Sequence, residues 1–153
     1  MRSASDYGAF VRGLFINLAR EGVLRRQSLP LEVHVSSDNR SGFLFTHTPG
    51  FLYNDGATLK VEETFVVKTG GAVRRERYTY NYQRPGGYFF RFEREQHDGD
   101  LVYKPEYHLH VLWRLPHFPS MPLTLEETLD FIRVNFYGPH RQRLVGHSLE
   151  VQI

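Results

Sequence analysis

The stretch that decides the fold is TLKVEETFVVKTGGAVRRERYTYNYQRPGGYFFRFEREQ, residues 58–96. Apolar and polar side chains alternate along most of it, which is the pattern of half-buried β-strands. The glycine doublets Gly70-Gly71 and Gly86-Gly87 interrupt the alternation where hairpin turns are expected. We therefore predict three consecutive antiparallel strands, at residues 58–69, 72–83 and 88–96.

The register of these strands follows from the lengths of the turns. A two-residue loop at Gly70-Gly71 pairs Glu63 with Tyr78 and predicts that Arg75 lies on the polar face. At the second turn, a two-residue loop would place charged side chains among the tyrosines, so the hydrophobic pattern favours a three-residue loop at 85–87. The polar face is then predicted to carry Glu62, Thr64, Arg75, Arg77, Thr79, Asn81, Phe89, Arg91, Glu93 and Glu95.

Helices and further strands flank this stretch. An apolar stripe with helical spacing predicts an N-terminal helix at about 5–21, and a Thr124…Glu127 capping box opens a C-terminal helix at about 124–137. Strand patterns are also present near 29–35, 43–47 and 106–113, whereas the proline-rich segment 116–122 is interpreted as a connector.

The predicted fold class is α+β. An antiparallel β-meander of four or more strands, at about 29–113, is expected to pack on the N-terminal and C-terminal helices. Because the chain has 153 residues and no long linker or internal repeat, residues 1–153 are predicted to form a single domain.

Composition excludes several function classes. The chain has no cysteine, so it has no disulfide framework, thiolate nucleophile or zinc ribbon. It also lacks a P-loop, a Gly-x-Ser-x-Gly elbow and an apolar run long enough to span a membrane, and we expect a cytoplasmic protein. Of the 19 cationic residues 16 are arginine, whose planar guanidinium suits phosphate recognition. Four of the 8 histidines lie in residues 97–117.

The pair His108-x-His110 is the strongest chemical signal. Two imidazoles at i and i+2 on one strand share a face, and imidazole is the side chain ordinarily suited to proton transfer near neutral pH, so the pair can act as acid and base. With Arg91 stabilising charge on phosphorus, this set fits metal-independent RNA cleavage by an internal 2′-hydroxyl.

A metal site is the competing interpretation of the histidine pair. Glu106, Glu93 or His97 could add ligands for zinc or manganese, but no third ligand stands at a diagnostic spacing. We therefore expect no metal and no other cofactor. Surface histidines without a function remain a further alternative.

A family resemblance adds to this interpretation. Four features carry it, namely His97 and the segments Arg91-Phe92-Glu93, Tyr107-His108-Leu109-His110-Val111 and Pro122–Leu129. Through these features the chain resembles, over roughly residues 58–136, the TumE-like toxins of bacterial type II toxin–antitoxin pairs. It implies a growth-inhibiting toxin that acts on RNA and is encoded beside a helix-turn-helix antitoxin. By position, it implies Arg91, Glu93, His108 and His110 as the catalytic residues.

The leading hypothesis is thus a toxin-like ribonuclease whose partners are RNA and a helix-turn-helix antitoxin. The RNA backbone is expected to contact Arg75, Arg77, Lys104 and His97. No membrane partner is expected, and homodimerisation is left open. The alternatives are a non-catalytic module that binds nucleic acid or protein through an arginine-rich sheet face, and a metal-dependent hydrolase that uses His-x-His.

Overall fold

The computed structural model describes most of the chain, namely residues 1–25, 30–95, 104–113 and 115–138. The chain divides into two compact units, Met1–Pro122 and Leu123–Ile153, and we describe each by itself. That the whole chain forms a single domain therefore stays a prediction.

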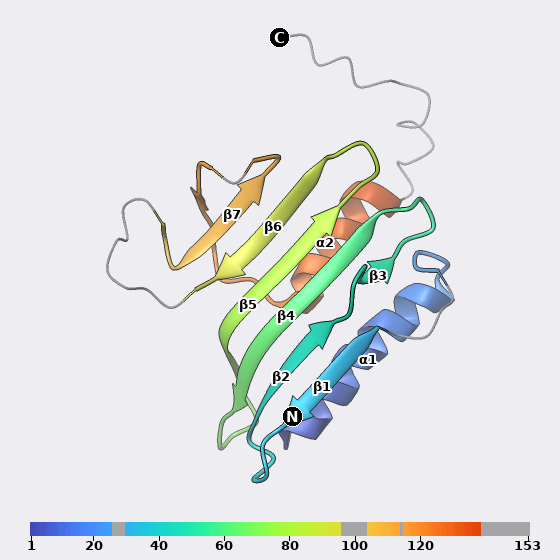
Figure 1. Cartoon of the computed structure of the whole chain (residues 1–153). Helices are drawn as coiled ribbons and strands as arrows, with labels where there is room; N and C mark the ends of the chain where they lie inside the picture. Colours follow the sequence, from blue (N-terminus) through green and yellow to red (C-terminus); the bar gives the residue numbers. More distant parts are fainter. Residues whose placement is uncertain (26–29, 96–103, 114, 139–153) are drawn as a thin grey trace. The chain divides into compact units, whose positions relative to one another are not determined.

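The first unit is built on an eight-stranded sheet in which every described pair is antiparallel (Figure 1). Its strands run in the order β1 (Leu31–Val35), β2 (Ser41–Thr46), β4 (Thr58–Val67), β5 (Val73–Gln83), β6 (Phe89–Arg94), β7 (Tyr107–Val111) and β8 (Phe118–Pro119). The short strand β3 (Phe51–Leu52) pairs with β4. The predicted α+β class and antiparallel meander are confirmed, and the meander extends into the segment that we interpreted as a connector.

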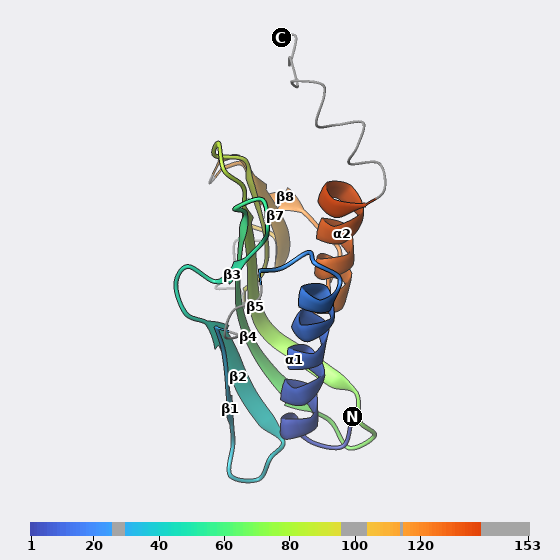
Figure 2. The ribbon, with the colours of Figure 1, turned by 90° about the vertical axis from the view of Figure 1, so that its right-hand side faces the viewer.

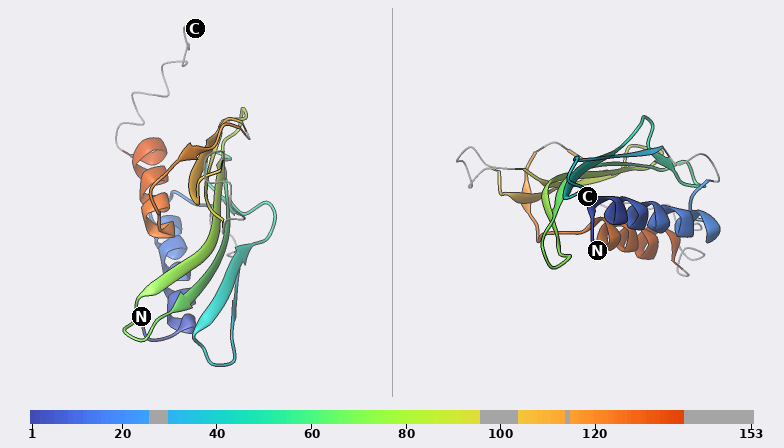
Figure 3. Two further views of the ribbon diagram at one scale, coloured as in Figure 1. Left: turned by 90° about the vertical axis from the view of Figure 1, so that its left-hand side faces the viewer. Right: turned by 90° about the horizontal axis from the view of Figure 1, so that it is seen from below.

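Helix α1 (Ala4–Arg20) lies along one face of this sheet (Figures 2 and 3). The hydroxyl of Ser3 accepts a 3.1 Å hydrogen bond from the backbone N–H of Asp6 and so caps the first turn. The ring of Tyr7 packs edge-on against Phe65, with centroids 4.6 Å apart, and Phe15 stacks on Phe51. The predicted N-terminal helix and its apolar stripe are therefore confirmed.

Helix α2 (Leu125–Tyr137) belongs to the second unit. Thr124 and Glu127 form the predicted capping box, in which each side chain accepts a hydrogen bond from the backbone N–H of the other residue. Among the described residues, neither this helix nor α1 has the length and apolarity that crossing a membrane requires.

The turn between β4 and β5 differs from the prediction by one residue. Lys68 donates its backbone N–H to the carbonyl of Ala72, so the loop has three residues, and Phe65 lies opposite Arg75. A β-bulge at Glu76 then restores the predicted pairing of Glu63 with Tyr78. The prediction that Arg75 lies on the polar face is wrong, because the longer loop turns it to the side of α1.

The turn between β5 and β6 has the predicted three-residue length. Arg84 donates its backbone N–H to the carbonyl of Tyr88, and Tyr82 lies opposite Phe90. Gly86 and Gly87 both have positive φ angles, of 94° and 93°, which explains why this turn needs glycine. Tyr78, Tyr80, Tyr82, Phe90 and Phe92 therefore share the face toward α1, and Arg91 and Glu93 lie on the opposite face.

Candidate functional site

The far face of the sheet is the face that points away from α1. Glu63 and Phe65 point toward α1, since their side chains contact Tyr7. Neighbouring positions on a strand point to opposite sides, and paired residues share a side. From β2 to β7 the far face therefore carries Phe43, Phe45, Lys60, Glu62, Thr64, Arg77, Thr79, Asn81, Phe89, Arg91, Glu93, His108 and His110.

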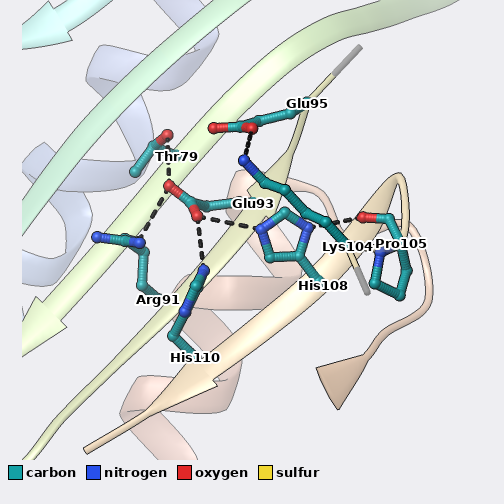
Figure 4. Close-up of polar contacts among 8 residues, drawn as sticks. All are labelled: Thr79, Arg91, Glu93, Glu95, Lys104, Pro105, His108 and His110. Atoms are coloured by element: carbon teal, nitrogen blue, oxygen red, sulfur yellow. Dashed lines mark hydrogen bonds and ion pairs between the residues drawn. The ribbon is translucent and has the colours of Figure 1, made fainter. Parts of the chain in front are cut away.

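Glu93 stands at the centre of a polar cluster on this face (Figure 4). Its Oε2 lies 2.9 Å from Nε2 of His110 and 3.2 Å from Nε2 of His108. Its Oε1 lies 3.0 Å from Nε of Arg91 and 3.4 Å from the hydroxyl of Thr79, which donates to it. The register explains this arrangement, because β6 and β7 place Glu93 directly opposite His108. The four residues predicted to be catalytic thus meet around one carboxylate.

This cluster is largely covered. His108 and His110 are 0% and 1% exposed and Glu93 is 7% exposed, whereas the side chain of Arg91 is 28% exposed. Nδ1 of His108 donates to the carbonyl of Pro105 at 2.7 Å, which leaves its Nε2 directed at Glu93. A buried carboxylate is stable only when cations or hydrogen-bond donors surround it. Each contact between an imidazole nitrogen and Oε2 therefore needs a proton or another cation between the two atoms.

A third histidine, His117, joins the pair. The ring centroids of His108, His110 and His117 are separated by 5.0, 4.9 and 4.6 Å, so the three rings form a closed triangle. Their potential ligand nitrogens all lie within 4.8 Å of one another. Strand β8 brings His117 there, because Leu109 pairs with Phe118, the residue that follows His117.

His117 is not among the ligands expected from the sequence. Residues 116–122 have the prolines of a connector, and a two-residue strand that contains Pro119 is too short to show the periodicity of a strand. One signal in the sequence could have found it, because edge strands tolerate proline and residues 118–119 could therefore form one. Pairing of such a strand with β7 brings His117 next to His108 and His110.

The structure separates the residues predicted to bind nucleic acid. Arg77 lies on the far face, opposite Thr64. Lys104 contacts the carboxylate of Glu95, and this hydrogen bond lowers the pKa of Glu95. Arg75 lies on the other face, as described above, and His97 lies outside the described residues. Of the four, Arg77 shares a face with the Glu93 cluster, and Lys104 lies beside the cluster, directly before Pro105, whose carbonyl His108 contacts (Figure 4).

A second buried carboxylate, Glu63, lies beneath α1. Tyr7 donates a 2.6 Å hydrogen bond to its Oε1, Tyr80 donates to its Oε2, and Nε of Arg75 lies 3.5 Å from Oε2. Burial raises the pKa of Glu63, and the hydrogen bonds from the tyrosines and the charge of Arg75 oppose that rise. This cluster is not expected from the sequence, because the predicted two-residue loop places Arg75 on the polar face.

An open hollow borders the Glu93 cluster. It has a volume of about 310 Å³ and is lined by Asn81, Gln83, Phe89, Arg91, Leu112 and Trp113. Trp113 is 74% exposed. A smaller hollow of about 140 Å³ is lined by Phe43, Glu62, Glu63, Thr64, Arg77, Tyr78 and Thr79. The far face therefore presents an arginine and an aromatic ring at each of two hollows.

Comparisons with known proteins add no functional information. No protein-family model, no curated protein and no solved structure matches the chain. The resemblance to TumE-like toxins therefore stays a prediction, and the functional argument rests on the geometry of the far face.

Proposed function

We propose that the protein binds single-stranded RNA on the far face of the sheet. The observation that supports this most directly is the hollow beside the Glu93 cluster, where an exposed tryptophan, a phenylalanine, an arginine and two side-chain amides converge. Proteins recognise single-stranded RNA with these same groups. Bases stack on aromatic rings, guanidinium groups bind phosphates, and amides bond to the edges of bases.

The second hollow extends this surface across the sheet. Phe43 is 39% exposed, and its ring stacks on Phe45 with centroids 5.3 Å apart. Phe43 on β2 and Phe89 on β6 are three strand spacings apart across the sheet, about 14 Å, and about six residues apart along the strands, about 20 Å, so they lie about 25 Å from each other. This separation accommodates several nucleotides of an extended chain, with Arg77 and Arg91 beside the two aromatic positions.

The binding proposal is tested by the fluorescence of Trp113, which is the only tryptophan in the chain. We expect unlabelled single-stranded RNA to quench this fluorescence as a base stacks on the indole ring. In anisotropy titrations with labelled oligoribonucleotides, Trp113→Ala should weaken binding about five-fold or more, because one stacked base contributes about 1–3 kcal/mol. Arg91→Ala should also weaken binding.

Arg12→Ala is the matched control for the arginine variant. Arg12 is exposed on α1, away from the far face, so its removal changes the net charge equally and should leave RNA affinity unchanged. Circular dichroism checks that each variant is folded. Equal affinity in wild type, Trp113→Ala and Arg91→Ala would show that RNA does not bind in this hollow.

Cleavage of the bound RNA is a second candidate function, favoured by the contact of Arg91, His108 and His110 with Glu93. In this reaction one imidazole takes the 2′ proton, the other protonates the 5′ leaving oxygen, and Arg91 stabilises the charge on phosphorus. Both imidazoles are buried, so the reaction requires the site to open to the RNA.

This candidate predicts growth inhibition when the protein is expressed in bacteria, and cleavage of RNA in the presence of a chelator. His110→Ala and Arg91→Ala should each abolish both effects, whereas His47→Ala, at an exposed histidine on the same chain, should retain them. Immunoblots check that the variants accumulate equally. Undiminished growth inhibition by both site variants would refute the assignment.

A further inference from the structure

We propose that His108, His110 and His117 together bind one divalent transition-metal ion, with the carboxylate of Glu93 beside it. Among the described residues these three histidines form a group whose ligand nitrogens lie within 4.8 Å of one another. The inference rests on this geometry alone and does not depend on RNA binding.

The spacing of the polar atoms fits a small ion. Metal–nitrogen bonds of 2.0–2.1 Å in a tetrahedral site place neighbouring ligand atoms about 3.3 Å apart. Oε2 of Glu93 already lies 2.9 and 3.2 Å from the Nε2 atoms of His110 and His108. The histidine nitrogens lie at most 4.8 Å apart, so each pair has to approach by no more than about 1.5 Å to bind one ion. His117 directly precedes the short edge strand β8.

Surrounding contacts prepare the histidines as ligands. A histidine that binds a metal through one nitrogen usually donates its other N–H to a carbonyl or carboxylate. His108 does so, because its Nδ1 donates to the carbonyl of Pro105 and its Nε2 is left for the ion. Glu93 is held in place by Arg91 and Thr79 at Oε1, while Oε2 faces the imidazoles and supplies the negative charge that a buried dication requires.

The ligand set selects the class of metal. Imidazole nitrogens suit zinc, copper, nickel and iron, whereas magnesium and calcium prefer oxygen ligands. Three histidines with one further position are typical of zinc centres that bind water or substrate. Zinc is therefore the first ion to test.

Purified full-length protein, stripped with a chelator and dialysed against Zn²⁺, provides the test. We expect about one zinc per chain by elemental analysis in wild type, and none in His117→Ala or in the milder His117→Asn. Replacing zinc with Co²⁺ should give the visible absorption bands of a tetrahedral site in wild type and lose them in both variants. Zinc should also raise the melting temperature of wild type but not that of the variants.

A matched control comes from the exposed histidines His34 and His47, which both contact Glu32. His47→Ala should retain the bound zinc and the cobalt bands. Zinc that is lost in His47→Ala but kept in the His117 variants would overturn the proposal, as would a wild-type protein that binds no zinc. Because the wild-type cobalt spectrum is measured directly, the test does not depend on the folding of any variant.

The result also bears on RNA cleavage. A metal ion would occupy the nitrogens that metal-independent cleavage uses for proton transfer, so the two assignments exclude each other. Bound zinc with no RNA cleavage in a chelator supports the metal site and refutes that reaction. Binding of RNA in the hollow beside Trp113 is measured separately by fluorescence and is unaffected by either outcome.

Discussion

The side chain of Glu63 connects α1 to the sheet, because it accepts hydrogen bonds from Tyr7 on α1 and from Tyr80 on β5. Glu63 is 1% exposed, and both of its oxygens are contacted by side chains from two elements, Tyr7 on α1 and Tyr80 and Arg75 on β5. Burying a carboxylate is unfavourable unless such partners surround it. The partners are themselves buried polar groups, so removing the carboxylate would leave them without an acceptor. The same burial raises the pKa of Tyr7 above its ordinary range, with the charge of Glu63 as the second cause.

Removing this carboxylate should therefore destabilise the protein strongly. We expect Glu63→Ala to lower the free energy of unfolding by about 3–5 kcal/mol, because Tyr7, Tyr80 and Arg75 are left without their acceptor. Its neighbour Glu62 points to the far face, so Glu62→Ala should change stability by only about 0.5 kcal/mol. Chemical denaturation measures both, and equal effects of the two variants would contradict the role of Glu63.

Glu63→Gln extends this prediction to pH. A carboxyl group whose pKa is raised by folding favours the folded state most below its unfolded pKa, near 4.5, and loses that contribution as pH rises through the folded pKa. The glutamine does not titrate. The stability of wild type relative to Glu63→Gln should therefore fall as pH is raised from about 4 to 7. A difference that rises with pH would show that folding lowers the pKa of Glu63 instead.

The strands of the meander were predictable from the sequence because one face of each is apolar. The alternation in residues 58–96 located β4, β5 and β6, and at the second turn the hydrophobic pattern excluded the wrong loop length. With that register Arg91 and Glu93 lie on the polar face, and the apolar alternation of residues 107–111 puts His108 and His110 on a polar face as well, which β6 and β7 bring together. The central part of the candidate site thus followed from periodicity alone.

Two elements were not predictable on the same grounds. The Gly70-Gly71 doublet is compatible with loops of two or three residues, and the bulge at Glu76 lets the longer loop keep the apolar pattern on both sides. Both loop lengths keep the apolar residues on one face, so the sequence pattern does not show on which face Arg75 lies. Strand β8 is too short to show alternation, so the approach of His117 to β7 depends on tertiary pairing.

Charge over the whole chain limits how RNA can bind. The formal net charge is only +2, and on the far face Glu62 and Glu93 lie among the cations. Nonspecific electrostatic attraction is therefore weak, and stacking on aromatic side chains must supply much of the affinity. This differs from proteins that hold nucleic acid in a strongly basic groove, whose binding depends steeply on salt.

The salt dependence of RNA binding should therefore be shallow. One arginine lines each of the two hollows, Arg91 in the larger and Arg77 in the smaller. Each phosphate contact with single-stranded nucleic acid contributes a slope of about −0.7 to log K against log salt concentration, so two contacts give about −1.4. Anisotropy titrations at several salt concentrations measure this slope.

Arg77→Ala should reduce the slope to about −0.7, and Arg12→Ala should leave it unchanged, because Arg12 lies on α1. A slope steeper than about −3 would require phosphate contacts well beyond these two arginines, and would place the RNA on a different surface of the protein.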